Sequence, residues 1–180
     1  KQGETHDINI FIKKFLKKTQ NKNCLELGSF PGPFLTTIGD LGYELNGVDF
    51  HPDNSTRLPA WLKDEGYQIG KFKTDDIFNI DKSAKYDLVC SFGLIEHFKD
   101  YDKLIKLHSD LLKTNGTLII TTPNMRGWLQ YIFRKILDKE NLNAHYLPSM
   151  KPKKWKDVLE KDGFNIEYYG YFGNFGFWVA

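Results

Sequence analysis

The order of the apolar segments is the feature that most limits the fold of this chain. Short runs rich in β-branched and aromatic residues alternate with amphipathic stretches of helical length along most of the 180 residues. This alternation is typical of βαβ units, in which helices connect parallel strands. We therefore expect an α/β fold. At about 150 residues per domain, the length predicts one domain over residues 1–180, with a helical and loop excursion over residues 123–162.

The local patterns predict the individual elements. Apolar spacing and helix caps predict helices over residues 8–16, 33–42, 55–65, 101–113, 125–137 and around 155–162. Alternating and continuous apolar runs predict strands over residues 23–27, 43–48, 67–72, 86–90, 117–121, 164–171 and 175–179. The last two strands would form a hairpin through Gly173 and Asn174. In the run KPKKWK, we expect Trp155 to face the core and the lysines to face solvent.

Charge and hydropathy argue against nucleic-acid and membrane partners. Lys and Arg number 25 against 23 Asp and Glu, so a net charge of +2 gives no field that would hold a polyanion, and we expect no nucleic-acid partner. No apolar run approaches the roughly 20 residues that span a bilayer, so we expect no membrane partner. The first residues lack the order of a secretory signal, and we expect a cytoplasmic protein. The sequence lacks an initiator Met and ends inside FGFWVA, which suggests trimming at both ends, so a signal or a further segment beyond them could not be observed.

The two cysteines are expected to be core residues. Cys24 and Cys90 lie inside the apolar runs NKNCLELG and YDLVCSFG, where a thiol behaves as a small hydrophobic group. We expect both thiols to be buried. They should lie on neighbouring strands but out of register, too far apart for a disulfide, and should therefore stay reduced. The sequence contains no CxxC, HExxH or similar spacing, so we expect no metal.

A glycine-containing loop follows the first predicted strand. In CLELGSFPGPF, Glu26, Gly28, Phe30 and Gly32 occupy alternate positions ahead of a helix. Such a loop lets a ligand approach unpaired backbone N–H groups at the helix N-terminus, although an ordinary tight turn would also need glycine. The dinucleotide fingerprint GxGxxG fails at Phe30 and Pro33, which argues against a nicotinamide-dependent oxidoreductase.

An acidic residue ends the second predicted strand. Asp49 lies 21 residues after Gly28, in NGVDFHPD. A separation of roughly 20 residues is typical of the acid that accepts hydrogen bonds from ribose hydroxyls bound over the first turn. The alternative is a surface aspartate that caps the next helix.

Taken together, these segments resemble the class I S-adenosylmethionine-dependent methyltransferases, in particular the small-molecule type 11/type 12 group. LELGSFPG resembles the first motif of that family, VDF its second-strand acidic site and TDDIFN its adenine loop. YDLVCSFGLIEHF and LKTNGTLIITTPN resemble its fourth-strand and fifth-strand motifs. The resemblance implies S-adenosylmethionine as the cofactor. It also implies a Rossmann-like three-layer sandwich whose mainly parallel seven-stranded sheet has the order 3-2-1-4-5-7-6, with strand 7 antiparallel.

The resemblance further implies roles for individual residues. Glu26 and the backbone of Gly28 would hold the methionine end of the cofactor, Asp49 would bind the ribose, and Phe50 would lie against the adenine. The complete set of implied cofactor-binding residues is Glu26, Gly28, Phe30, Gly32, Asp49, Phe50, Asp75, Asp76, Ile77 and Ser91. Asp75 or, by preference, Asp76 would accept from the adenine amine beside the Ile77 backbone, and Ser91 would meet the methionine amino group.

Phe30 departs from the family pattern, because most members have a second glycine at this position. Its ring must either fold over the methionine tail of the cofactor or point away into the core. If the ring instead occludes the loop, the chain would be a non-catalytic domain that keeps the fold for binding or scaffolding. This is the alternative to an enzyme.

Two histidines are candidates for the acceptor side. His97 follows the fourth strand and could act as a general base for a hydroxyl acceptor, or it could be a structural histidine. His145 lies in the excursion, where Arg126, Tyr131, Arg134 and Tyr146 could line a lid or simply form an ordinary packed helix. The chain has SFGL where amino-methylating DNA enzymes of the family carry an Asn/Asp-Pro-Pro-aromatic tetrapeptide. We therefore expect methyl transfer to oxygen or nitrogen of a small-molecule, sugar or sugar-conjugate acceptor.

Overall fold

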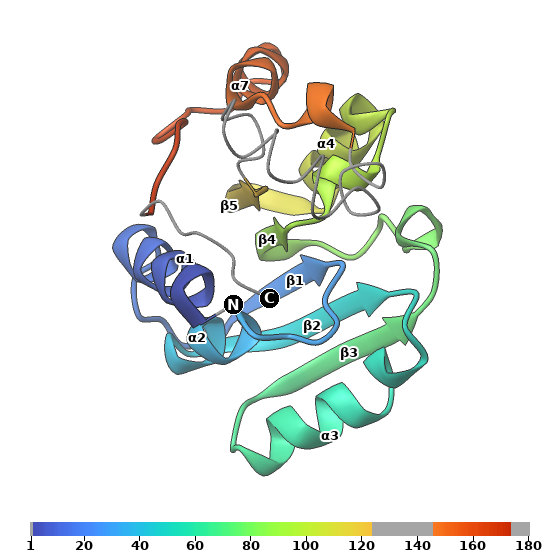
Figure 1. Cartoon of the computed structure of the whole chain (residues 1–180). Coiled ribbons are helices and arrows are strands. Elements are labelled where there is room, and N and C mark those ends of the chain that lie inside the picture. Colours follow the sequence, from blue (N-terminus) through green and yellow to red (C-terminus); the bar gives the residue numbers. More distant parts are fainter. Residues whose placement is uncertain (1, 124–145, 174–180) are drawn as a thin grey trace, which may run out of the picture. The chain divides into compact units, whose positions relative to one another are not determined.

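The computed structural model describes residues 2–123 and 146–173. They form an α/β fold built on a five-stranded parallel sheet with the strand order β3-β2-β1-β4-β5 (Figure 1). The strands are β1 (Lys22–Leu27), β2 (Tyr43–Asp49), β3 (Ile69–Thr74), β4 (Tyr86–Phe92) and β5 (Leu112–Thr121). The helices are α1 (Gln2–Phe15), α2 (Leu35–Asp40), α3 (Arg57–Asp64), α4 (Tyr101–Asp110) and α7 (Pro152–Lys161). Short 3₁₀ turns cover Pro52–Asn54, Ile77–Asn79, Ile95–His97 and Leu147–Ser149.

The chain divides into two compact units. The first unit takes the described residues of 1–90 and 111–117 together with 172–173, and the second takes 91–110 and the described residues of 118–171. In the first unit, β1 pairs in parallel with β2 on one side and with β4 on the other, and β2 pairs with β3. The carboxyl ends of β1, β2 and β3 therefore point the same way, as the arrowheads in Figure 1 show.

Apolar packing explains the elements of the first unit. The last four residues of β1 are buried, as expected for a parallel strand covered on both faces. Helix α2 packs on β2, α3 packs on β3, and α1 contacts α2 through a face that buries Ile12. The apolar spacing that predicted a helix over residues 8–16 thus corresponds to the packed side of α1.

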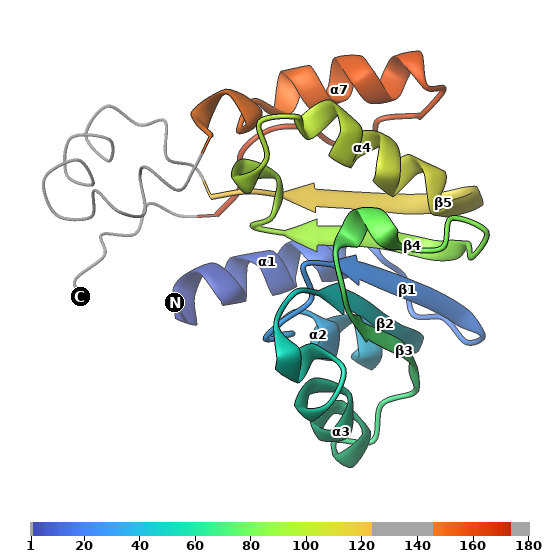
Figure 2. The same cartoon turned by 90° about the vertical axis from the view of Figure 1, so that its right-hand side faces the viewer.

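The second unit is organised around α4 and α7, which lie side by side (Figure 2). Helix α4 buries Leu104, Ile105 and Leu107, three residues at helical spacing along its inner face. Helix α7 buries Trp155, whose indole N–H donates to the Ser149 carbonyl at 2.6 Å. The prediction that Trp155 faces a core is therefore confirmed.

Most predicted elements are confirmed to within a few residues, but several bounds need correction, among them those of the strand predicted over residues 117–121, which begins at Leu112. The third strand begins at Ile69 rather than at residue 67, and the helix predicted over residues 33–42 is only the short α2. The helix predicted to reach residue 113 ends at Asp110, because β5 already begins at Leu112.

The predicted strand over residues 164–171 is wrong, since this segment has irregular backbone. The Tyr168 hydroxyl donates to the Tyr171 carbonyl at 2.7 Å around Gly170, whose φ is +152°. The structure describes five strands rather than the seven expected, and the predicted strand over residues 175–179 and helix over 125–137 lie outside the described residues.

The prediction for the cysteines is confirmed. Both thiols are free and fully buried. In the β1/β4 ladder, Cys24 lies opposite Leu88 and Glu26 lies opposite Cys90, so the two thiols are two residues out of register. Across the described residues, no helix has the length and apolar content needed to cross a membrane.

Candidate functional site

The loop after β1 turns over the end of β2. Gly28 has φ +74°, in the left-handed region that glycine adopts at low cost. Its N–H donates to the Val48 carbonyl at 2.9 Å, and the N–H of Ser29 donates to the same carbonyl at 3.3 Å. Gly28, which the sequence singled out, and its neighbour Ser29 are therefore held directly against the residue that precedes Asp49.

Asp49 stands at the carboxyl end of β2 and is held by two backbone amides. One carboxylate oxygen, Oδ2, accepts from the Phe30 N–H at 3.1 Å, and Oδ1 accepts from the His51 N–H at 2.8 Å. Each oxygen of an ionised carboxylate offers two lone pairs, so each can accept one further hydrogen bond. The carboxylate therefore has a fixed plane and the capacity to bind two more donors.

The rings of the two amide donors are in contact with each other. The Phe30 ring stacks on the His51 imidazole with a centroid separation of 3.8 Å and an interplanar angle of 2°. Phe30 is half-buried in this contact, and its expected position over the methionine tail of the cofactor stays a prediction. We call this contact the Phe30/His51 stack.

A second contact joins the loop to the turn Pro52–Asn54. The Ser29 hydroxyl donates to the Asn54 Oδ1 at 2.7 Å, and the Asn54 amide donates to the Lys73 carbonyl at 2.9 Å. Gly47 makes room for this bond, because a Cβ at that position would lie 2.3 Å from the Ser29 Oγ. Sequence reasoning missed Ser29, Asn54 and His51, since nothing local marks them as partners.

Glu26 is a buried acid inside the sheet. It lies opposite Gly47 in β2 and opposite Cys90 in β4, and 2% of its surface is exposed. Its Oε2 has no hydrogen-bond partner among the residues that the structure describes. Burial, reinforced by the negative charge of Asp49, raises the pKa of Glu26 well above its ordinary value of 4.5. An orphaned carboxylate oxygen of this kind suits a cationic or hydrogen-donating ligand.

The two acids after β3 have different environments. The backbone N–H of Asp75 donates to the Asp49 carbonyl at 3.1 Å, which ties this loop to the end of β2. The Asp75 carboxylate is engaged by Lys73 and Asn79, and these bonds lower its pKa. Asp76 instead caps the turn Ile77–Asn79 by accepting from the Phe78 N–H at 2.9 Å.

The apolar residues expected to contact the adenine differ in exposure. Phe50 is 70% exposed, directly after Asp49, whereas Ile77 is buried. Phe78, which the sequence did not single out, is also partly exposed. The loops after β2 and β3 thus bring Phe50, Asp75, Asp76 and Ile77 to the same carboxyl edge of the first unit.

Ser91, in the second unit, belongs to a buried polar chain. Its hydroxyl lies 3.0 Å from the Nε2 of His108, and the Nδ1 of His108 lies 2.7 Å from the Leu104 carbonyl. A carbonyl can only accept, so Nδ1 carries the proton and Nε2 accepts from the Ser91 hydroxyl. Burial lowers the pKa of His108 to about 4. The Ser91 hydroxyl is therefore committed to a protein partner that the sequence did not reveal.

Residues of the acceptor side also lie in the second unit. Glu96 is buried and accepts from the Thr122 hydroxyl at 2.9 Å, while its carbonyl accepts from the Tyr146 N–H at 2.6 Å. His97 ends the turn Ile95–His97 and is exposed. His145, Arg126, Tyr131 and Arg134 lie outside the described residues.

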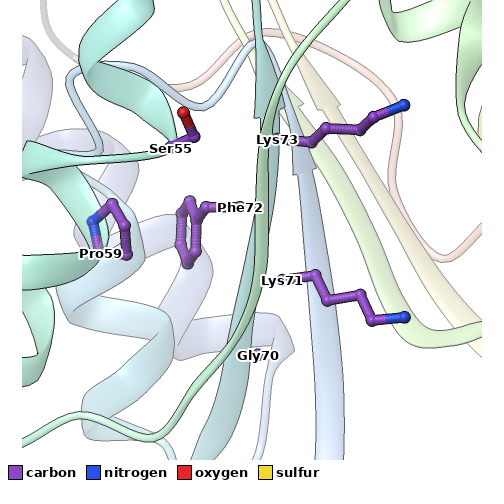
Figure 3. A pocket seen from close by; sticks show the side chains of 6 residues that line it. All are labelled: Ser55, Pro59, Gly70, Lys71, Phe72 and Lys73. Atoms are coloured by element: carbon purple, nitrogen blue, oxygen red, sulfur yellow. The ribbon is translucent and has the colours of Figure 1, made fainter.

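A surface cavity of about 430 Å³ lies along β3, lined by Ser55, Pro59, Gly70, Lys71, Phe72 and Lys73. Figure 3 shows Phe72 pointing toward Pro59 and Ser55, whereas Lys71 and Lys73 extend to the other side of the strand. None of these six residues belongs to the motifs discussed above. Within residues 2–123 and 146–173, no group of His, Cys, Asp or Glu side chains is arranged to hold a metal ion.

A family model covers most of the chain. The family model described as "Methyltransferase domain" matches residues 5–169. This chain belongs to the methyltransferase-domain family. The expectations of family, fold class and cofactor class drawn from the sequence motifs are thereby confirmed.

Curated relatives of this methyltransferase-family chain include enzymes with different acceptors. It is 26% identical over 126 residues to a ubiquinone biosynthesis O-methyltransferase of Bradyrhizobium diazoefficiens, covering 66% of this chain and 49% of that enzyme. It is 29% identical over 168 residues to a protein N-terminal and lysine N-methyltransferase of Candida glabrata, covering 84% of this chain and 64% of that enzyme. The chain thus spans less than two thirds of the length of these two relatives.

Solved structures support the fold of this methyltransferase-family chain. Magnesium protoporphyrin IX methyltransferase from Synechocystis, solved with bound SAH, superposes with a TM-score of 0.72 at 16% identity, covering 95% of this chain and 79% of that one. A putative methyltransferase from Bacillus halodurans gives a TM-score of 0.69 at 17% identity, covering 89% of this chain and 70% of that one.

Proposed function

We propose that this chain transfers a methyl group from S-adenosylmethionine to an oxygen or nitrogen of a small-molecule, sugar or sugar-conjugate acceptor. The observation that carries the proposal is Asp49. Its carboxylate stands at the carboxyl edge of the sheet beside the Gly28 loop, and two amides hold its plane while leaving it able to accept two more hydrogen bonds. Open α/β sheets bind ligands at this edge.

The residues of the first unit fit the cofactor. The orphaned Oε2 of Glu26 suits the positively charged methionine end, and Asp49 suits the two ribose hydroxyls. Phe50 offers an exposed ring for the adenine face, and Asp76 is the better acceptor for the adenine amine because the Asp75 carboxylate already contacts Lys73. When bound, the cofactor supplies an electrophilic methyl group on a sulfonium.

The contribution of the chain to the transfer is mainly positioning. Displacement at a methyl carbon requires the acceptor atom in line with the sulfur, and orientation alone can supply about 7 kcal/mol or more. His97 is our candidate base for a hydroxyl acceptor, and His145 a second acceptor-side candidate. The role of Ser91 at the methionine amino group likewise stays a prediction of the sequence resemblance, as does that of Gly32 in the loop.

The test is calorimetric titration of S-adenosylhomocysteine into three proteins. We expect wild type to bind, and Asp49→Ala to bind at least about 10-fold more weakly because two charge-assisted hydrogen bonds are lost. Asp40→Ala is the matched control, since this exposed aspartate ends α2 and precedes β2, at the opposite edge of the sheet. Equal affinity of wild type and Asp49→Ala would remove the ribose assignment.

Failure of wild type to bind would favour the alternative, a non-catalytic domain that keeps the fold. The acceptor class needs a separate assay, in which S-adenosylhomocysteine release is measured with hydroxylated small molecules, amines and sugars. A protein substrate belongs in the same panel, because one relative is named for methylating protein N-termini and lysine. We also propose a cytoplasmic location, which the two free buried thiols support.

A further inference from the structure

A closed ring of contacts joins Asp49, Phe30 and His51. It consists of the Asp49 carboxylate, the backbones of the other two residues, and their side-chain rings. Each carboxylate oxygen accepts from the N–H of one of these residues, at 3.1 Å and 2.8 Å. The rings carried by the same two residues then meet at 3.8 Å between centroids, with their planes 2° apart. We propose that the Phe30/His51 stack is a clamp that sets the orientation of Asp49 and thereby makes the protein select a ligand with an intact ribose diol. This inference rests on the proposed function.

The two sides of the clamp differ in rigidity. His51 caps the turn Pro52–Asn54: its Nδ1 accepts from the Asp53 N–H at 3.2 Å, and its carbonyl accepts from the Asn54 N–H at 3.0 Å. Phe30, by contrast, lies between Gly28 and Gly32, which have φ +74° and +78°. Glycine backbone is conformationally permissive, so this side needs an added constraint.

The stack supplies that constraint. Two hydrogen bonds from backbone N–H groups fix the plane of a carboxylate only while the two donating N–H groups keep a constant separation. The ring contact holds Phe30 at a fixed distance from His51, and the Ser29 hydroxyl adds a second link to the same turn through Asn54 at 2.7 Å. Removing either ring would remove one of these two links and so loosen the position of the Phe30 N–H that holds Asp49.

The orientation of Asp49 matters for a diol in particular. Each oxygen already accepts one N–H and retains capacity for one further donor. Vicinal hydroxyls present two donors at a fixed spacing, and both are satisfied only if the carboxylate plane is correctly placed. A ligand that lacks one hydroxyl depends less on the orientation of that plane. Loss of the clamp should therefore weaken binding of the intact diol more than binding of the deoxy ligand.

The opposite hypothesis is that the Phe30 ring obstructs the loop. It predicts that Phe30→Gly opens the loop and tightens cofactor binding, whereas the clamp predicts that the same change weakens it. The two hypotheses therefore differ in the sign of one measured quantity.

The experiment measures by calorimetry the affinities of S-adenosylhomocysteine and its 2′-deoxy analogue for each protein. We expect wild type to prefer the intact ligand by about 10-fold or more, the value of a hydrogen bond to a charged group. In Phe30→Gly and His51→Ala, affinity for the intact ligand should fall by about 10-fold while affinity for the analogue stays nearly constant. The double variant should be no worse than either single one.

Two controls separate the clamp from simple destabilisation. Phe30→Tyr keeps a stacked ring and should keep the preference for the intact ligand. Phe172→Leu disrupts a different stack, with Phe11 at 4.3 Å in the same unit, and should leave both affinities unchanged. His51 is exposed, so His51→Ala decides the question if Phe30→Gly does not fold.

Three results would overturn the clamp. Tighter binding by Phe30→Gly would support obstruction, and equal losses for both ligands in Phe30→Gly and His51→Ala would show a structural role only. An unchanged preference in both variants would show that the stack is irrelevant to Asp49. If wild type binds neither ligand, the proposed function fails and the clamp fails with it.

Discussion

The Ser91 hydroxyl donates to the Nε2 of His108 across 3.0 Å, and both side chains are fully buried. His108 links this hydroxyl to the Leu104 carbonyl, to which its Nδ1–H donates at 2.7 Å. The bond places a neutral histidine directly behind the end of β4. It has consequences for stability that can be measured without any knowledge of the acceptor.

His108 should make the protein less stable in acid. Burial lowers its pKa from 6.5 to about 4, so between these values the unfolded chain binds a proton that the folded chain does not. Stability from this group is complete above pH 6.5 and is lost as the pH falls toward 4, by about 3 kcal/mol in total. Urea unfolding at pH 7 and pH 4.5 should show a smaller acid loss in His108→Gln than in wild type. Identical losses in the two proteins would refute the assignment.

Glu26→Gln should stabilise the protein without ligand and weaken cofactor binding. The pKa of Glu26 is raised, so this group lowers folding stability as the pH rises above 4.5, and at pH 7 the neutral amide should gain about 1–3 kcal/mol. The melting temperature without ligand should rise, while the affinity for S-adenosylhomocysteine falls. A variant that melts earlier and binds equally well would contradict both parts.

Gly32→Ala should destabilise the protein through one identifiable contact. A Cβ at Gly32 would lie 2.6 Å from the Leu58 Cδ1 in α3, and φ is +78°. Gly163→Ala is the control, because φ is +85° there but no described atom lies within 4 Å of the added Cβ. Gly32→Ala should therefore cost about 1–3 kcal/mol more than Gly163→Ala in urea unfolding. Leu58 is itself buried, so Leu58→Ala should cost less in the Gly32→Ala background than in wild type, and an equal cost at both glycines would rule out the contact.

His97→Ala should separate a catalytic from a structural histidine. The side chain is exposed, and exposed substitutions usually change stability by less than about 0.5 kcal/mol, so the melting temperature should hardly move. If His97 is the base for a hydroxyl acceptor, kcat should fall by roughly 100-fold while S-adenosylhomocysteine affinity is unchanged. A variant with full kcat that melts earlier would establish the structural interpretation instead.

The family, and the edge of the sheet at which we propose that the cofactor binds, could both be predicted from the sequence alone. The glycine loop after β1 and the acid at the end of β2 are local features, written in LELGSFPG and VDF. The parallel strands then require both to lie at one edge, and the structure places Asp49 within hydrogen-bond distance of the loop. The burial of Cys24 and Cys90 could also be predicted from local sequence, because both cysteines have apolar neighbours.

The contacts between side chains could not be predicted from the sequence and became visible in the folded chain. The Phe30 ring contacts His51 although helix α2 and strand β2 separate the two residues along the chain, and the Ser91 hydroxyl, in β4, donates to His108, in α4. The segment over residues 164–171 has the composition of a strand but an irregular backbone. A strand needs a hydrogen-bonded neighbouring strand, and a stacked ring or a buried hydroxyl needs a partner that is distant in sequence. Local pattern and propensity cannot predict such distant partners.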